Sequence, residues 1–112
     1  MQPEDKIRLT HMLDAAQKAV EFGKGKNEVV LAKDEKLTLA IVRLLEIVGE
    51  AAKNVSEETR NQSLDIPWKD IAGTRDRLIH GYFDVDLNIV GEIITKDLPN
   101  LITRLKKLIQ QD

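Results

Sequence analysis

The sequence contains no cysteine, which excludes a disulfide scaffold and cysteine-ligated metal sites. Aromatic residues make up only 4% of the chain, so the core must be mainly aliphatic. No apolar run approaches the roughly 18 residues of a membrane-spanning helix. The N-terminal stretch MQPEDKIRLT is charged and lacks the apolar segment of a secretory signal. These absences predict a cytoplasmic protein without a membrane association.

The chain has 112 residues, a length typical of one domain, and we expect a single domain over residues 1–112. Dimerisation would help a chain of this size to bury more surface. Hydrophobic residues make up 42% and charged residues 32%, which is an ordinary globular balance. The net charge of −2 gives no general attraction to nucleic acid, and any RNA or DNA site must therefore be local.

Helical periodicity dominates the sequence, with segments at about residues 4–22, 34–55, 67–81 and 86–109. The second segment carries apolar residues outside its main stripe, which is typical of a helix that is central in a bundle or shared with a partner. Pro99 should interrupt the fourth helix, because it cannot donate a hydrogen bond to the carbonyl of Thr95. The run NEVVLAK, residues 27–33, is ambiguous. We predict an all-α fold, an antiparallel bundle of four main helices.

Arg75 occupies an unexpected place in the third predicted helix. On a wheel of about 100° per residue, six apolar or aromatic residues fall within about 60° of it: Trp68, Ile71, Ala72, Leu78, Ile79 and Tyr82. A buried guanidinium needs partners for its charge and its donors. Three explanations remain open. The side chain extends along the stripe to water, it pairs with Glu46 or Glu50 of the second helix, or the stripe faces a cleft that binds an anion.

His80 lies about 140° from Arg75 on the same wheel, so one ideal helix does not direct both side chains to one point. Asp76 precedes His80 by four residues, a spacing at which helical side chains meet. A carboxylate there would hold the imidazole in one tautomer and raise its basicity. Taken singly, His80 also fits a surface histidine near a helix C-terminus, and Tyr82 fits an ordinary core residue.

The stretch RDRLIHGY places Arg75, His80 and Tyr82 in the order Arg-x4-His-x-Tyr. This motif resembles the signature of the HepT-like branch of the HEPN superfamily. The similarity continues through residues 66–86 (IPWKDIAGTRDRLIHGYFDVD), 44–58 (LLEIVGEAAKNVSEE) and 94–105 (ITKDLPNLITRL), so it extends over essentially the full chain.

The resemblance implies a homodimeric, metal-independent endoribonuclease without a cofactor, the toxin of a toxin–antitoxin pair. In such a dimer, the motif residues of both protomers line one cleft for RNA. Arg75 would hold the phosphate, because its charge and its forked donors match phosphate oxygens. His80 would act as general base or acid. Asp76 would orient the histidine or shape the cleft.

The resemblance also implies a partner, a cognate minimal nucleotidyltransferase that serves as the antitoxin. Tyr82 would be the residue to which this partner transfers AMP. The added negative charge and bulk would block RNA from the cleft.

Two other functions fit the sequence. The chain would be a non-catalytic HEPN module that binds a nucleotide or a protein partner, which suits its acidic balance. Alternatively, it would be a structural helical dimer without a site, which suits the apolar surplus of the second helix. The structural alternative predicts that Arg75 forms a salt bridge within the fold and that no open polar groove exists.

Overall fold

The computed structural model describes residues 1–80 and 84–111. Its elements in chain order are α1 (Pro3–Gly23), α2 (Glu28–Lys33), α3 (Glu35–Lys53), α4 (Glu57–Arg60), α5 (Trp68–Ala72), α6 (Thr74–Leu78), β1 (Ile79–His80), β2 (Asp84–Val85), α7 (Leu87–Glu92), the π-helical stretch η1 (Ile93–Asp97) and α8 (Leu98–Gln110). Apart from the short β1–β2 pair, the elements of this described part are helical.

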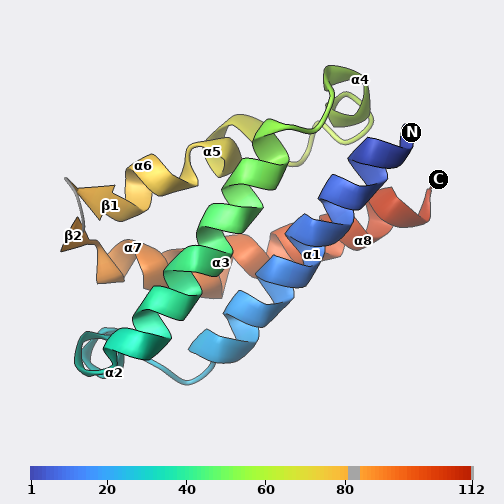
Figure 1. Ribbon diagram of the computed structural model, residues 1–112. Coiled ribbons are helices and arrows are strands. Elements are labelled where there is room, and N and C mark those ends of the chain that lie inside the picture. Colours follow the sequence, from blue (N-terminus) through green and yellow to red (C-terminus); the bar gives the residue numbers. More distant parts are fainter. Residues whose placement is uncertain (81–83, 112) are drawn as a thin grey trace.

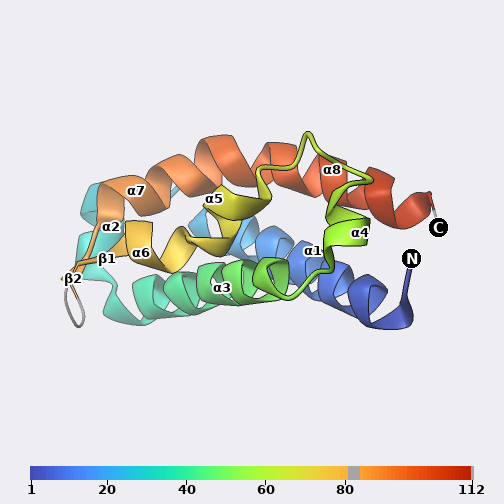
Figure 2. The same cartoon turned by 90° about the horizontal axis from the view of Figure 1, so that it is seen from above.

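The long helices form an antiparallel bundle. Helices α1 and α3 run side by side in opposite directions, and the segment α7–η1–α8 crosses them (Figure 1). Helices α5 and α6 lie between α3 and this C-terminal segment, as the view from above shows (Figure 2). The predicted all-α bundle of four main helical segments is therefore confirmed, with α5 and α6 together as the third segment.

The core is aliphatic, as the low aromatic content predicts. The side chains that are less than 2% exposed come mainly from the predicted apolar stripes: Leu9, Met12, Leu31, Ile41, Leu45, Ile66, Leu78, Leu105 and Leu108. Trp68 is a buried aromatic residue, 7% exposed, and its indole Nε1–H donates to the carbonyl of Ser63 at 3.0 Å. Burial of these aliphatic side chains is the main source of stability in such a bundle.

Polar side-chain caps start the helices α2 and α3. Gly25 has a positive φ of 72°, which suits glycine in the turn after α1. The side chain of Asn27 then accepts the Val30 N–H, and the ambiguous run becomes the short helix α2. The side chain of Asp34 accepts the Leu37 N–H in the same way at the start of α3.

Gly49 lets α3 approach the segment that carries the motif. A Cβ atom at this position would lie 3.0 Å from the backbone oxygen of Ile71 and 3.6 Å from the Cβ of Thr74. The absence of a side chain on Gly49 therefore sets how closely the α5–α6 segment packs against α3.

The single third helix predicted over residues 67–81 is wrong. Gly73, with φ −89° and ψ 10°, separates α5 from α6. Glycine is a poor helix former, so it favours a break at this position. Helix α6 ends at Leu78, and the antiparallel pairs Ile79–Val85 and His80–Asp84 follow.

The predicted fourth helix is present from Leu87 to Gln110, with an irregularity before Pro99. The backbone N–H of Leu98 bonds the carbonyl of Ile93, five residues earlier, in the π-helical stretch η1. Pro99 has no N–H for a regular turn, and the interruption predicted there takes the form of this wider turn.

Candidate functional site

Arg75 lies on the exposed side of α6, so the predicted position on the apolar stripe is wrong. Its side chain is 68% exposed, whereas its neighbours Thr74 and Leu78 are buried. Its Nε lies 3.2 Å from Oε2 of Glu46 on α3, which is one of the three arrangements left open by the sequence. This ion pair uses one edge of the guanidinium, and the high exposure leaves the group accessible to a ligand.

His80 is in strand β1, with a side chain that is 61% exposed. Its Nε2 lies 3.4 Å from Oδ2 of Asp86, the residue that caps α7. The other carboxylate oxygen of Asp86 accepts the backbone N–H groups of Asn88 at 3.1 Å and Ile89 at 3.2 Å. Asp86 thus joins the imidazole to the first turn of a helix.

The pKa of Asp86 lies below its ordinary value. The hydrogen bond from the Ile89 backbone lowers it most, and partial burial opposes this effect. The hydrogen bond and the charge of the neighbouring His80, with the Asn88 N–H, lower the pKa further. Asp86 therefore remains an anion beside the histidine at neutral pH.

Asp76 does not contact His80, contrary to the expectation of a helical i, i+4 pair. The helix ends at Leu78, and the extended backbone that begins at Ile79 removes the helical spacing between the two side chains. Among the described residues, the carboxylate that contacts His80 is that of Asp86. Asp76 is exposed on α6 next to Arg75, so a role in shaping a cleft remains a prediction. Tyr82, the predicted modification site, lies outside the described residues.

The sequence carries a local signal for Asp86. An aspartate directly before the helical pattern of residues 87–92 is a strong N-cap candidate, and a cap lies at the start of its helix. The β-pairing of residues 79–80 with 84–85 brings this cap to the histidine. Sequence spacing alone did not reveal that pairing.

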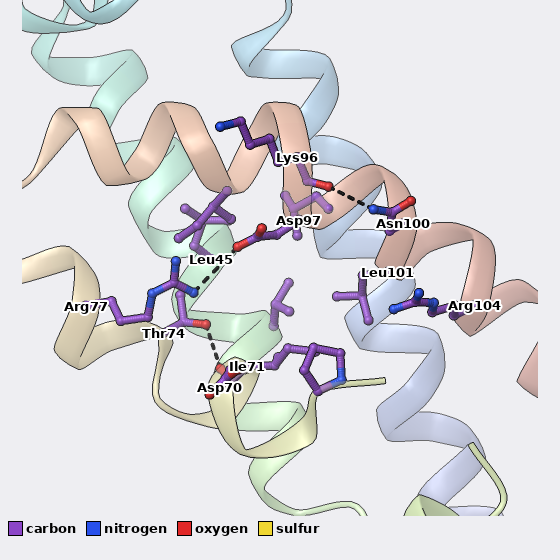
Figure 3. A pocket seen from close by; sticks show the side chains of 14 residues that line it. Leu45, Asp70, Ile71, Thr74, Arg77, Lys96, Asp97, Asn100, Leu101 and Arg104 are labelled. Carbon is purple, nitrogen blue, oxygen red and sulfur yellow. Dashed lines mark hydrogen bonds and ion pairs between the residues drawn. The ribbon is translucent and has the colours of Figure 1, made fainter. Parts of the chain in front are cut away.

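A cavity of about 550 Å³ lies on another side of α6, between α5, α6 and the η1–α8 segment (Figure 3). Its floor is apolar, with Leu45, Ile71 and Leu101, and its rim carries Arg77 and Asp97, which pair at 3.5 Å. Arg75 and His80 do not line it. The cavity is therefore separate from Arg75 and His80.

Among residues 1–80 and 84–111, no group of three or more acidic or histidine side chains is arranged to hold a metal ion. In the same part of the chain, no helix combines the length and the apolar character needed to cross a membrane.

Comparisons with known proteins identify the family of the chain. The family model "Ribonuclease HepT-like" matches residues 12–108. "Putative RNase TTE0752" of Caldanaerobacter subterraneus subsp. tengcongensis is 43% identical over 104 residues, which are 93% of this chain and 93% of that protein. "Gamma-glutamylcyclotransferase and putative RNase MJ0434" of Methanocaldococcus jannaschii is 38% identical over 111 residues, 99% of this chain but 50% of that protein.

A third relative, "Probable ribonuclease HepT" of Thermococcus cleftensis, is 40% identical over 75 residues, 67% of this chain and 68% of that protein. No solved structure matches the chain. Because the family model covers most of the sequence, the chain belongs to the HepT-like ribonuclease family.

Proposed function

We propose that this protein is a metal-independent endoribonuclease of the HEPN type, in which Arg75 and His80 act on the RNA phosphodiester. The observation that carries the proposal is the exposure of both side chains, 68% and 61%, on the consecutive elements α6 and β1. Each is held by a carboxylate from another element, Glu46 for the arginine and Asp86 for the histidine. Membership of a ribonuclease family supports RNA as the substrate.

The proposed reaction uses the 2′-hydroxyl of the RNA as nucleophile. Its oxygen attacks the adjacent phosphorus, the bond from phosphorus to the 5′-oxygen breaks, and a cyclic phosphate forms. His80 takes the proton of the 2′-hydroxyl while water protonates the leaving 5′-oxygen, or it protonates the leaving 5′-oxygen while water accepts the proton of the 2′-hydroxyl. Arg75 donates to the non-bridging oxygens, where negative charge builds up. The reaction requires neither a metal ion nor a cofactor.

We propose that the active form is a homodimer. Leu39 on α3 is 56% exposed and Val29 on α2 is 60% exposed, which leaves apolar surface available to a partner. Leu39 and Glu46 are seven residues apart and therefore share one face of α3, and Glu46 contacts Arg75. A second copy seated on this face would bury Leu39 and bring its own motif close to that of the first.

The proposal includes a role as the toxin of a toxin–antitoxin pair. A minimal nucleotidyltransferase would neutralise the toxin by transferring AMP to Tyr82. Co-expression with such a partner should add the mass of an adenylate to the wild-type chain and not to Tyr82→Phe. A Tyr82→Phe chain that still gains this mass would refute the assignment.

The test of the ribonuclease activity is cleavage of a structured RNA in EDTA. Arg75→Ala and His80→Ala should each abolish cleavage, and circular dichroism should show unchanged helix content. We expect the arginine variant to lose less than about 1 kcal/mol of stability, because exposed ion pairs contribute little. His11→Ala is the matched control, since His11 is exposed on α1 and should leave cleavage unchanged.

Two results would contradict the proposal. Unfolding of Arg75→Ala would make the arginine a structural ion-pair member. An intact dimer that cleaves no RNA at any concentration would favour the non-catalytic HEPN module instead.

A further inference from the structure

Asp86 is fixed by three sets of contacts, one of which is with His80 of strand β1. Its backbone N–H donates to the carbonyl of Leu78, the last residue of α6, at 2.8 Å. Its Oδ1 accepts the two N–H groups at the start of α7, and its Oδ2 faces His80 Nε2 at 3.4 Å. The carboxylate therefore has one defined orientation in which only Oδ2 is available to the imidazole.

We propose that Asp86 is a positioning residue that keeps the His80 proton on Nε2 and leaves Nδ1 as the basic atom for the RNA. The inference rests on the proposed ribonuclease function. A carboxylate accepts hydrogen bonds and does not donate, so the neutral imidazole that faces it carries its N–H on Nε2. Nδ1 then has its lone pair free to take the proton of the 2′-hydroxyl.

The capping role makes Asp86→Asn an informative substitution. Asparagine caps helices about as well as aspartate, so we expect the variant to fold normally. Its side-chain oxygen would remain bound to the N–H groups of Asn88 and Ile89, and its NH₂ group would face His80. Nε2 would then have to accept a hydrogen bond, and the ring proton would move to Nδ1, the atom that must act as base.

The size of the effect follows from the geometry. Reversal of the tautomer beside a buried carboxylate lowers kcat by up to about 10,000-fold in serine proteases. The contact here is 3.4 Å long and the ring is 61% exposed, so the imidazole retains more freedom. We therefore expect Asp86→Asn to lower kcat by about 10- to 100-fold and to change KM by less than about twofold.

Asp84→Asn is the matched control. Asp84 is exposed and stands opposite His80 in the strand pair, so its side chain leaves the same face of the pair without a hydrogen bond to the ring. Its replacement removes the same charge without a change in the cap of α7. We expect wild-type kcat and an unchanged tautomer. An equal loss of kcat in the two variants would assign the effect to charge in general and overturn the proposal.

A second readout does not depend on RNA. Long-range ¹H–¹⁵N spectra at high pH, with His11 as internal reference, should show His80 with its proton on Nε2 in the wild type and on Nδ1 in Asp86→Asn. The same tautomer in both proteins, or wild-type kcat in Asp86→Asn, would overturn the proposal. If the tautomer switches as expected but the wild type does not cleave RNA, the ribonuclease function fails and the positioning contact stands.

Discussion

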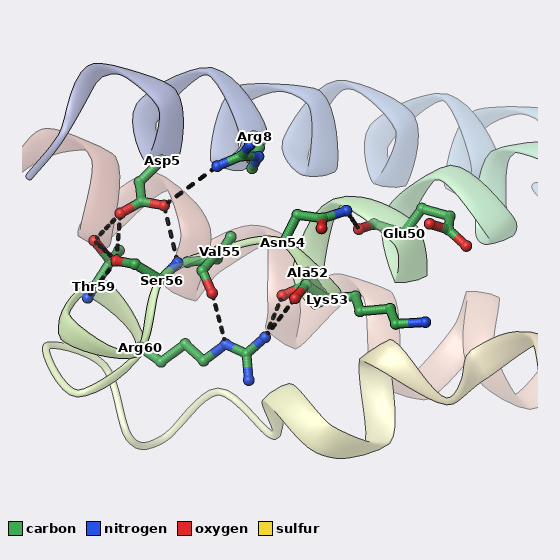
Figure 4. Close-up of polar contacts among 10 residues, drawn as sticks. All are labelled: Asp5, Arg8, Glu50, Ala52, Lys53, Asn54, Val55, Ser56, Thr59 and Arg60. Carbon is green, nitrogen blue, oxygen red and sulfur yellow. Dashed lines mark hydrogen bonds and ion pairs between the residues drawn. The ribbon is translucent and has the colours of Figure 1, made fainter.

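Asp5 provides the sharpest test of how this bundle is held together. It lies in the first turn of α1 and is 2% exposed. Its carboxylate accepts hydrogen bonds from the Ser56 backbone N–H at 2.9 Å, the Ser56 hydroxyl at 2.5 Å and the Thr59 hydroxyl at 2.7 Å (Figure 4). These bonds join the N-terminus of α1 to the connection that follows α3. Arg8 adds a distant ion pair at 3.9 Å.

We expect Asp5→Asn to destabilise the protein by about 2–3 kcal/mol. A hydrogen bond to a charged acceptor contributes about 1 kcal/mol more than a neutral one, and three such bonds lose their charge. The asparagine amide also has a single oxygen acceptor, whereas the donors of Ser56 and Thr59 now bind both carboxylate oxygens of Asp5. At roughly 4 °C per kcal/mol for a chain of this size, Tm should fall by about 10 °C.

The pH dependence of this effect has a defined sign. Burial by itself raises the pKa of Asp5, but the hydrogen bonds from Ser56 and Thr59 and the charge of Arg8 outweigh it and hold the pKa below its ordinary value. A carboxyl group whose pKa is lower in the folded state contributes stability above its unfolded pKa, about 3.9. That contribution is lost as pH falls through the folded pKa.

Urea denaturation of the wild type and Asp5→Asn at pH 7 and at steps below pH 5 would test this. The difference in free energy of unfolding should be largest at pH 7 and should shrink as the wild-type carboxylate takes up its proton. Asp14→Asn is the control on the same helix, because its pair with Lys18 is exposed and contributes less than about 0.5 kcal/mol. If the free energies of unfolding of the wild type and Asp5→Asn differ by less than about 0.5 kcal/mol at pH 7, the role assigned to Asp5 is wrong.

Three further predictions concern the face that carries the motif. Gly49→Ala should lower the free energy of unfolding by about 1–3 kcal/mol and reduce RNA cleavage, because the added Cβ would press on the backbone of α5. Gly91→Ala is the control: the added Cβ meets open space, so this variant should be more stable by about 0.5–1 kcal/mol. Thermal denaturation measures both changes. Glu46→Gln should lower KM for RNA at constant stability, because the carboxylate competes with phosphate for Arg75; a raised KM would contradict this. Leu39→Asp should shift the protein towards monomer in analytical ultracentrifugation and reduce RNA cleavage. If the variant dimerises with wild-type affinity, the dimer interface does not include Leu39.

The sequence by itself determined the fold class and the long helices. Apolar residues at helical spacing mark the buried faces of α1, α3 and the C-terminal segment, and those faces form the core. The Arg-x4-His-x-Tyr motif, on which the family resemblance rests, was also identified from the sequence alone. These features are local in the chain, because helical periodicity and a run of motif residues need no information about distant contacts.

The tertiary structure alone decided how the motif residues are placed. The wheel that put Arg75 on the apolar stripe assumed an unbroken helix, and the break at Gly73 turns the arginine to the surface. The packing of α3 against α6 places Glu46, and not Glu50, in contact with Arg75. His80 contacts the carboxylate of Asp86 rather than that of Asp76, because the pairing of residues 79–80 with 84–85 brings Asp86 to the histidine. Such contacts depend on where the helices end and on which elements then pack against each other. No fixed residue spacing in the sequence predicts these two features.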